Sequence, residues 1–476
     1  MRQQSGVSAP TCQPSALRRR LALALLVAWL LPACGTFEVG VERTPTPDGA
    51  LAATMTALED ENRRLATEVA SFTDPLTSAG VGKVAYVQGG DIWVRAIPSG
   101  LPQRLTTDGR NASPRWSPTG GWLAFRKAEG QVWLMREDGT DARPLSGGAI
   151  VGEFAWSPRD ERLAYATGAG DLRLADPEAS QPVTLIQRRA DNRGPNEIGR
   201  MAWRSDGAEI AFEWRELQET QAGSGGGIWR VSLETGRTAE LYRGEAILAG
   251  WSGDDAAVLF WEGSAVSSSL TEGLPLLVAP LEGSLSRQPI ATTLTYRDFV
   301  APAPDGTNRV ALISGTGRGV WTNKTLRVVD VVGREQVTLT PPGQAASSPV
   351  WSPDGQQLAY VSAPDRRVDP LETGDAAQRE LAQRRLLVVD AAAAGQPRAL
   401  TDNPAYRDEQ PDWSSDGEQV LFARLDTEGR ASLWLVSSQG GEPRRVVDEL
   451  SPSPDWLGYY GHIEWERLYD WWRGPR

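Results

Sequence analysis

Histidine and cysteine are almost absent from this chain of 476 residues, which has one histidine, His462, and two cysteines, Cys12 and Cys34. A zinc site needs several clustered His or Cys ligands. A Ser-His-Asp triad would depend on His462 alone, and no Gly-x-Ser-x-Gly segment supplies its nucleophile. We therefore expect no catalytic residues, no metal and no cofactor, and we predict that the chain is not an enzyme.

Phenylalanine and tyrosine are also scarce, with 8 and 9 residues, whereas the chain has 19 tryptophans, 49 glycines and 33 prolines. Glycine and proline at this level, beside an apolar fraction of 40%, favour a fold made of many short strands and turns. The excess of tryptophan over the other aromatic residues indicates a structural position that recurs along the chain.

Basic residues are outnumbered, and the formal net charge is -12 at pH 7. An acidic surface repels the phosphates of nucleic acid and anionic lipid headgroups. We therefore expect no nucleic-acid partner.

The N-terminus carries an export signal. Arg18-Arg19-Arg20 precede the apolar run from Leu21 to Leu31, whose 11 residues are about half of the ~20 that span a bilayer. The following Leu31-Pro32-Ala33-Cys34 resembles the lipobox of bacterial lipoproteins, although proline is unusual at its second position. The resemblance implies that residues 1–33 are removed and that Cys34 is lipidated, which anchors an extracytoplasmic protein to the cell membrane or outer membrane. The alternative is an ordinary cleaved signal with an incidental cysteine.

Residues 34–49 form a tether without periodicity, and residues 50–72 then show a heptad pattern. Leucine recurs every seven residues at one position of the heptad, and the alternating position holds Met, Asn and Val: Leu51, Leu58 and Leu65, with Met55, Asn62 and Val69. Leucine at d with one asparagine at a is typical of a two-stranded parallel coiled coil. We predict a parallel homodimer through residues 51–69. The alternative is a solitary amphipathic helix that lies on the following domain.

From residue 80 onward the chain repeats a short motif at intervals of 40 to 62 residues, which favours the blades of a propeller. A tryptophan begins most of these units, and we expect it to be structural. The unit tryptophans are Trp116, Trp156, Trp203, Trp251, Trp351 and Trp413, with Trp465 in the last unit; one unit, at Ala303-Pro304-Asp305-Gly306, lacks its tryptophan.

One unit, Trp351-Ser352-Pro353-Asp354-Gly355-x-x-Leu358-Ala359-Tyr360, resembles the WD-like repeat of the TolB family. The resemblance implies an all-β propeller over residues 80–476, and a role in binding an envelope protein or a cell-wall component.

The unit count predicts eight blades of four antiparallel strands. The first unit, which begins at Val84-Ala85-Tyr86, has no innermost strand of its own. A C-terminal strand from His462 to Leu468, with Trp465 in the position of Trp116, would complete it and close the ring. TolB proteins have six blades, so six or seven remain the alternatives.

The innermost strands of a propeller line its central channel, and polar residues there are candidates for binding. We predict a binding site at one channel mouth, formed by Glu153, Arg200, Asp298, Asp408, Gln410 and His462. The alternative is a water-filled channel with satisfied polar walls. These residues suit a non-catalytic binding scaffold, and the alternative function is a propeller hydrolase or lyase that acts on polysaccharide or peptide.

Overall fold

The structure is a computed structural model that describes residues 81–474 except 180, 188–195, 217–225, 264–271, 284–287, 333, 366–378, 380, 393–394 and 403–404. The signal peptide, Cys34, the tether and the heptad segment 50–72 lie outside the described residues and stay predictions. Within the described ranges, no helix is both long and apolar enough to span a membrane.

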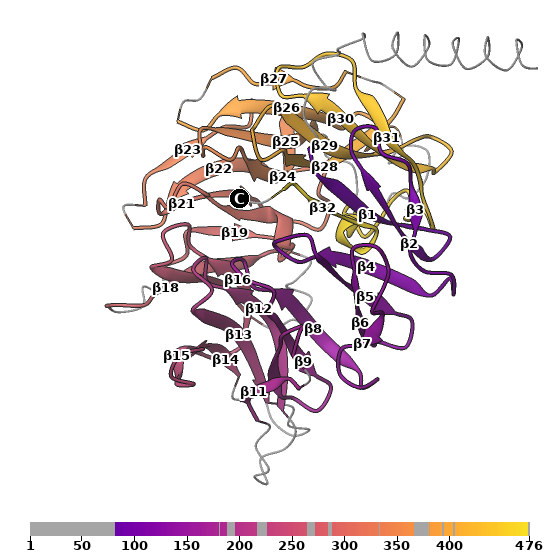
Figure 1. The fold of residues 1–476 in the computed structure, drawn as a ribbon. Coiled ribbons are helices and arrows are strands. Elements are labelled where there is room, and N and C mark those ends of the chain that lie inside the picture. Colours follow the sequence, from indigo (N-terminus) through magenta and orange to yellow (C-terminus); the bar gives the residue numbers. More distant parts are fainter. Residues whose placement is uncertain are drawn as a thin grey trace, which may run out of the picture. The chain divides into compact units, whose positions relative to one another are not determined.

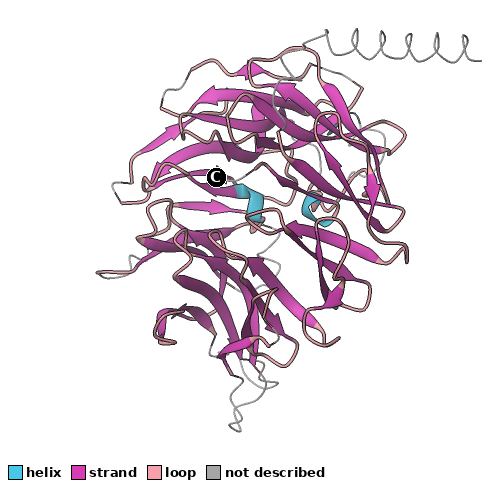
Figure 2. Cartoon of the chain, viewed as in Figure 1, coloured by secondary structure: helices cyan, strands magenta, loops and turns pink. Residues whose placement is uncertain are grey.

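The described chain is an all-β ring of eight sheets, each with four antiparallel strands, which confirms the predicted class and number of blades (Figure 1). Its helical residues lie mainly in two short 3-10 helices near the centre of the ring, η3 (Arg297–Phe299) and η4 (Trp465–Arg467) (Figure 2).

Blades 2 to 8 each consist of four consecutive strands, which run from the innermost to the outermost strand. Blade 2 contains β4 (Asn111–Trp116), β5 (Trp122–Lys127), β6 (Val132–Arg136) and β7 (Arg143–Pro144). Blade 3 contains β8 (Val151–Trp156), β9 (Leu163–Thr167), β10 (Leu172–Ala175) and β11 (Val183–Ile186). Blade 4 contains β12 (Asn196–Trp203), β13 (Glu209–Glu216), β14 (Gly227–Ser232) and β15 (Thr238–Arg243). Blade 5 contains β16 (Ala246–Trp251), β17 (Ala257–Glu262), β18 (Leu274–Pro280) and β19 (Ala291–Thr293).

The remaining three consecutive blades follow the same order. Blade 6 contains β20 (Val300–Pro302), β21 (Arg309–Ser314), β22 (Thr325–Asp330) and β23 (Gln336–Thr338). Blade 7 contains β24 (Gln344–Trp351), β25 (Gln357–Pro364), β26 (Arg385–Asp390) and β27 (Arg398–Ala399). Blade 8 contains β28 (Arg407–Trp413), β29 (Gln419–Leu425), β30 (Ala431–Ser437) and β31 (Arg444–Leu450).

Blade 1 joins the two ends of the propeller. Its three outer strands are β1 (Lys83–Gln88), β2 (Asp91–Ala96) and β3 (Gln103–Arg104), and its innermost strand is the C-terminal β32 (Tyr469–Trp472). A C-terminal strand thus closes the ring, as predicted. The predicted location of this strand, His462 to Leu468, is wrong, because the strand lies at Tyr469–Trp472. Val84 pairs with Trp471, as Leu123 pairs with Trp116 in blade 2. Trp471, and not Trp465, thus has the repeat position.

Most of the segment predicted as the closing strand does not pair with β1, because other contacts hold it. Trp465 lies in η4, and its indole Nε1 donates to Oε2 of Glu409 in blade 8 at 3.2 Å. The Asp470 carboxylate in β32 accepts a hydrogen bond from the backbone N–H of Trp116 at 2.7 Å. This contact ties the closing strand to the next blade.

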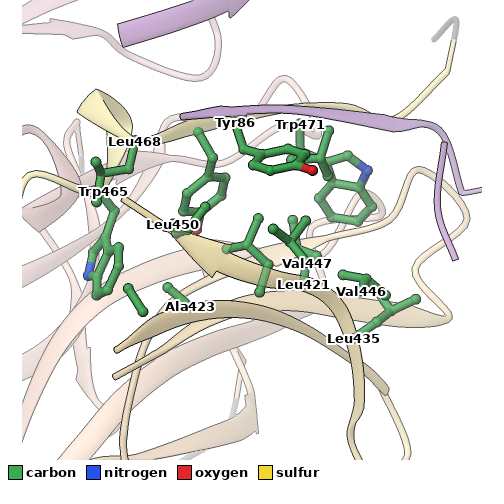
Figure 3. Packing of buried hydrophobic residues seen from close by; sticks show 14 of the residues in the cluster. Tyr86, Leu421, Ala423, Leu435, Val446, Val447, Leu450, Trp465, Leu468 and Trp471 are labelled. Carbon is green, nitrogen blue, oxygen red and sulfur yellow. The ribbon is translucent and has the colours of Figure 1, made fainter. Parts of the chain in front are cut away.

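Apolar side chains fill the spaces between blades, because both faces of each blade pack against a neighbour. Between blades 8 and 1, Tyr86 and Trp471 lie against residues of β29, β30 and β31 (Figure 3). The residues of blade 8 in this contact include Leu421, Leu435 and Val447, and each is at most 1% exposed. This packing stabilises the junction between the first and the last blade of the propeller.

The repeat tryptophans also link the blades by hydrogen bonds. In five blades the indole Nε1 donates to the carbonyl of the residue directly before the tryptophan position of the preceding blade. The five pairs are Trp156 with Arg115, Trp203 with Ala155, Trp251 with Ala202, Trp351 with Ala301 and Trp413 with Val350, at 2.7 to 3.2 Å. This repeated bond explains why the sequence uses tryptophan where phenylalanine would fill similar space. These hydrogen bonds give a physical reason for the structural role predicted for the repeat tryptophans.

Six innermost strands have a β-bulge two to four residues before the tryptophan position. The register shifts in this way in β4, β8, β12, β16, β24 and β28. At three of these bulges a non-glycine residue adopts a positive φ of about 50°: Ser113, Ser348 and Gln410. A bulge turns the local side chains away from simple alternation, so the direction of these residues does not follow from the strand pattern.

Candidate functional site

A cavity of about 1550 Å³ lies at the centre of the propeller. One wall comes from the innermost strands β4 and β8, with Arg200 from β12. The other wall is formed by Tyr296 and Arg297 and by the segment that connects β31 to β32. We call residues 451–468 the crossing segment, because they leave blade 8, contact blade 6 and return to blade 1.

Hydrogen bonds fix the crossing segment to blades on different sides of the ring. At its start, Ser451 N–H donates to the carbonyl of Val87 in blade 1 at 3.0 Å. Near its middle, the carbonyl of Tyr460 accepts a hydrogen bond from the N–H of Val320, beside blade 6, at 3.1 Å. At its end, the carbonyl of Leu468 accepts from the N–H of Val87 at 2.8 Å. The segment therefore narrows the channel and forms part of the cavity wall.

A buried group of charges anchors the crossing segment. The Glu409 carboxylate pairs with both Arg384 and Arg407, and both guanidinium groups donate to the carbonyl of Gly461. Burial raises the pKa of Glu409, but the two arginines outweigh it and lower the pKa to about 2. Glu409 is thus ionised at neutral pH and balances the buried arginines. Removal of one partner from such a group leaves an uncompensated buried charge.

His462 is held in the cavity wall by two partners. Its Nε2 lies 2.9 Å from Oδ1 of Asp298, and its ring stacks on Tyr296 with the centroids 3.7 Å apart. Oδ2 of Asp298 accepts a hydrogen bond from the Ser348 hydroxyl at 2.7 Å. The carboxylate therefore lies between the hydroxyl and the imidazole. Nucleophilic catalysis needs the imidazole between them, so this trio does not have the order of a hydrolase triad.

The charges of His462 and Asp298 support each other. Burial lowers the pKa of His462, but the nearby Asp298 carboxylate outweighs it and raises the pKa above its ordinary value. Burial likewise raises the pKa of Asp298, but His462 and the two hydrogen bonds outweigh it and lower the pKa.

The structure brings together some of the residues predicted at the channel mouth and separates others. Glu153, Arg200 and His462 line the cavity, and Asp298 lies behind His462. Asp408 does not line it; the side chain is fully buried and pairs with Arg424, with contacts of 2.7 and 3.0 Å. Gln410 also lies outside the cavity lining, at the bulge of β28.

Basic residues dominate the cavity although the chain as a whole is acidic. Seven basic side chains line it, against five acidic ones. The basic residues are Arg110, Arg115, Arg126, Lys127, Arg200, Arg297 and Arg467. Of these residues, only Arg200 was predicted from the sequence. One signal was present: Arg115 directly precedes the repeat Trp116, where the other units have Ala, Gly, Val or Asp.

Three of these arginines are fixed by main-chain carbonyls. Arg115 donates to the carbonyls of Pro114 and Glu466, Arg126 to those of Val151 and Gly152, and Arg200 to those of Leu248 and Thr295. Within the described ranges, none of the three has a carboxylate in ion-pair contact. Their charge is therefore positioned but not neutralised.

The arginines lie close enough to affect each other. Burial lowers the pKa of Arg126, and the charges of Arg115 and Arg467 lower it further, while Glu153 raises it. Burial also lowers the pKa of Arg200, with Arg297 as the next cause. An incoming anion would relieve this repulsion. Among the described residues, no group of three or more His, Cys, Asp or Glu side chains is placed to hold a metal ion.

Comparisons with known proteins support the assignment of the repeats. A profile of the anaphase-promoting complex subunit 4 WD40 domain matches residues 114–206. An uncharacterized protein of Agrobacterium fabrum is 28% identical over 138 residues, which are 26% of this chain and 46% of that protein. The Tol-Pal system protein TolB of Thioalkalivibrio sulfidiphilus is 36% identical over 92 residues, or 19% of this chain and 21% of that protein. The chain thus spans about a fifth to a half of the length of these relatives.

A solved structure shows the same fold at low identity. Dipeptidyl peptidase 4 of Porphyromonas gingivalis superposes with a TM-score of 0.52 and 13% identity, over 79% of this chain and 60% of that one. At this identity the likeness concerns the fold alone. Together with the repeats and the eight sheets, the sequence matches identify a TolB-like β-propeller.

Proposed function

We propose that this chain is a non-catalytic binding protein of the cell envelope, whose TolB-like propeller holds a partner in its central cavity. One observation carries the proposal: the cavity presents arginines that are fixed by main-chain carbonyls and lack carboxylate partners among the described residues. Groups held in this way are ready to bind and lose little freedom when they do so.

The arrangement around His462 supports binding rather than hydrolysis. Its Nε2 is engaged by Asp298, and the nearby Ser348 hydroxyl donates to that carboxylate and not to the imidazole. A general base must reach the proton of its nucleophile. The Ser348–Asp298–His462 group lacks this contact and instead fixes the crossing segment.

The N-terminal sequence and the relatives support the proposed location and partner class. The lipobox at Cys34 supports an extracytoplasmic protein with a lipid anchor, and two matched relatives are named as components of the Tol-Pal system. We propose an envelope protein or a cell-wall component as the partner. The heptad residues 51–69 would pair two anchored chains in parallel.

A photo-crosslinking experiment in intact cells tests the proposal. Tyr459 lines the cavity and is 60% exposed, whereas Leu101 lies on the loop before β3 and is 91% exposed. We replace each in turn with the photoreactive residue p-benzoylphenylalanine. We expect a covalent adduct with one envelope component from position 459 and none from position 101.

Two results would overturn the proposed function. The first is the absence of any adduct that depends on position 459. The second is product release when the purified protein is incubated with envelope polysaccharides or peptides, which would favour a propeller hydrolase or lyase instead.

A further inference from the structure

Six arginines line the central cavity, and five of them come from five different helices and strands. We call these five the arginine wall: Arg115 (β4), Arg126 (β5), Arg200 (β12), Arg297 (η3) and Arg467 (η4). Two of them have a carboxylate partner, Arg297 with Glu153 at 2.6 Å and Arg467 with Glu464 at 3.3 Å. The other three keep unused N–H donors, because a guanidinium has five and each of them uses two in the hydrogen bonds described above.

The wall has the properties of a site for carboxylates. A guanidinium binds a carboxylate through two parallel hydrogen bonds, and such bonds are stronger than those between neutral groups. Arg126 is additionally held over the ring of Phe154, with its Cζ 5.1 Å from the ring centroid. The side chain is thus fixed on two sides before any ligand arrives. An anion there would also offset the repulsion between Arg115, Arg126 and Arg467.

The acidic residues of the cavity argue against a sugar polymer as the ligand. Sugar hydroxyls need acceptors, but four of the five lining carboxylates are already engaged. Glu153 and Glu464 pair with arginines, Asp455 accepts from the N–H groups of Leu457 and Gly458, and Asp470 accepts from the N–H of Trp116. A ligand rich in carboxylates and poor in hydroxyls fits this lining better.

Apolar side chains between the arginines favour a peptide. Phe154, Ile463 and Leu468 line the cavity, as does Tyr459, which is 60% exposed. A peptide with acidic and apolar side chains matches such an alternation. A long polyanion such as nucleic acid does not, because the net charge of -12 repels it outside the cavity.

We infer that the arginine wall binds the side-chain carboxylates of an acidic peptide segment of the protein partner. The inference rests on the proposed function, because it names the chemistry that the propeller recognises. The partner's segment enters the central cavity, and its carboxylates pair with Arg115, Arg126 and Arg200.

Fluorescence anisotropy with the full-length protein in detergent tests this inference. The probe is fluorescein-labelled hexaglutamate, with hexaglutamine as the uncharged control. Hexaglutamate should bind, and its affinity should fall with added salt. The double variant Arg115→Gln/Arg126→Gln should weaken binding by about tenfold for each arginine. The matched variant Arg237→Gln/Arg445→Gln removes two exposed charges outside the cavity lining and should change affinity less than about twofold.

A second variant keeps the test decisive if the double variant fails to fold. Arg467 is 67% exposed, so Arg467→Glu should leave the melting temperature unchanged and still weaken hexaglutamate binding. Competition distinguishes the ligand classes. Tetragalacturonate or inorganic phosphate that displaces hexaglutamate at equal or lower concentration would overturn the choice of a peptide.

Failure of the inference and failure of the proposed function give different results. An adduct from position 459 without binding of hexaglutamate would retain the binding scaffold and reject the acidic peptide. Equal affinity of the wild type and Arg467→Glu would also reject the arginine wall, whatever the crosslinking shows.

Discussion

Asp298 lies between His462 and Ser348, with one carboxylate oxygen 2.9 Å from the imidazole Nε2 and the other 2.7 Å from the serine hydroxyl. Asp298 belongs to η3, which precedes blade 6, and His462 belongs to the crossing segment. Their contact therefore connects two segments 164 residues apart in sequence. It fixes the crossing segment on the side of the ring away from blades 1 and 2.

The Asp298→Asn substitution should lower the pKa of His462 to below its ordinary value. Burial lowers the pKa of this imidazole, and only the neighbouring acidic charges, Asp298 first, raise it. NMR titration is direct because the chain has a single histidine. Asp448→Asn, an exposed carboxyl on β31, is the matched control and should leave the pKa unchanged. A histidine pKa that is the same in all three proteins would contradict this account.

The same substitution should change how stability depends on pH. The raised pKa of His462 stabilises the fold fully below about pH 6.5, and this contribution is lost as the pH rises through the folded pKa. The lowered pKa of Asp298 stabilises the fold above about pH 3.9, and this is lost as the pH falls through its folded pKa. The unfolding free energies of wild type and Asp298→Asn should therefore differ most between about pH 4 and 6.5. Urea denaturation at several pH values measures this, and a difference that grows above pH 8 would be inconsistent with it.

Trp413→Phe should destabilise the propeller by about 1 kcal/mol, because it removes the indole hydrogen bond to Val350 and keeps most of the buried ring. Trp116 offers a matched control. Its Nε1 is buried and has no hydrogen-bond partner within the described part of the chain, so Trp116→Phe should be neutral or stabilising. Thermal unfolding of both variants gives the comparison. A larger loss for Trp116→Phe would reject the role of the hydrogen bonds between blades.

Trp471→Ala should destabilise the propeller by about 3–5 kcal/mol, because a large buried side chain is lost at the ring closure. The variant also loses the hydrogen bond of 2.9 Å from Trp471 to the carbonyl of Val81. Trp133→Ala, which removes a half-buried tryptophan from β6, should cost less. Chemical denaturation measures both. Equal losses would show that the closure is not a special point of the ring.

Glu409→Gln should destabilise the fold by about 3–5 kcal/mol, because two buried arginines lose their shared counter-charge. The pKa of about 2 also predicts resistance to acid. The contribution of Glu409 is present above its unfolded pKa and is lost as the pH falls toward 2. Acid unfolding of Glu409→Gln should therefore begin at a higher pH than acid unfolding of the control Glu428→Gln, which alters an exposed ion pair. The reverse order would exclude this role.

Cys34→Ser should release the protein from membranes, because the lipid would have no attachment site. Mass spectrometry should show the loss of the acyl mass, and fractionation should place the variant in the soluble fraction. Cys12→Ser lies in the segment that we expect to be removed, so it should leave membrane retention unchanged. Retention of both variants would reject the lipid anchor.

The fold was largely predictable because it repeats. Seven recurring turns indicated the class, and the strand that follows each turn, together with the earlier Val84-Ala85-Tyr86, gave the count of eight blades, which the structure confirms. The closing strand was placed about six residues too early, since Trp465 and Trp471 offer the same signal and only the pairing with Val84 decides between them. The spacing of the tryptophans alone does not show whether Trp465 or Trp471 lies in the closing strand.

The candidate site was predictable only in part, for two physical reasons. The bulges in six innermost strands rotate residues such as Gln410 in β28, and a bulge without glycine has no clear sequence mark. The arginines of the cavity also come from segments far apart in sequence, such as Arg126 and Arg467. Asp408 illustrates the same limit, because its partner Arg424 lies on the adjacent strand and buries it.

The pairing of β1 with β32 has a consequence for the synthesis and folding of the protein. The inner edge of β1 stays unpaired until the last strand is synthesised. Val84 pairs with Trp471, which is made only after nearly 390 further residues. Until then blade 1 presents an open strand edge, which invites pairing with other chains. A nascent chain that crosses a membrane would reach the far side in this unfinished state. We therefore expect a protein of this topology to depend on holding chaperones during secretion until its final strand arrives.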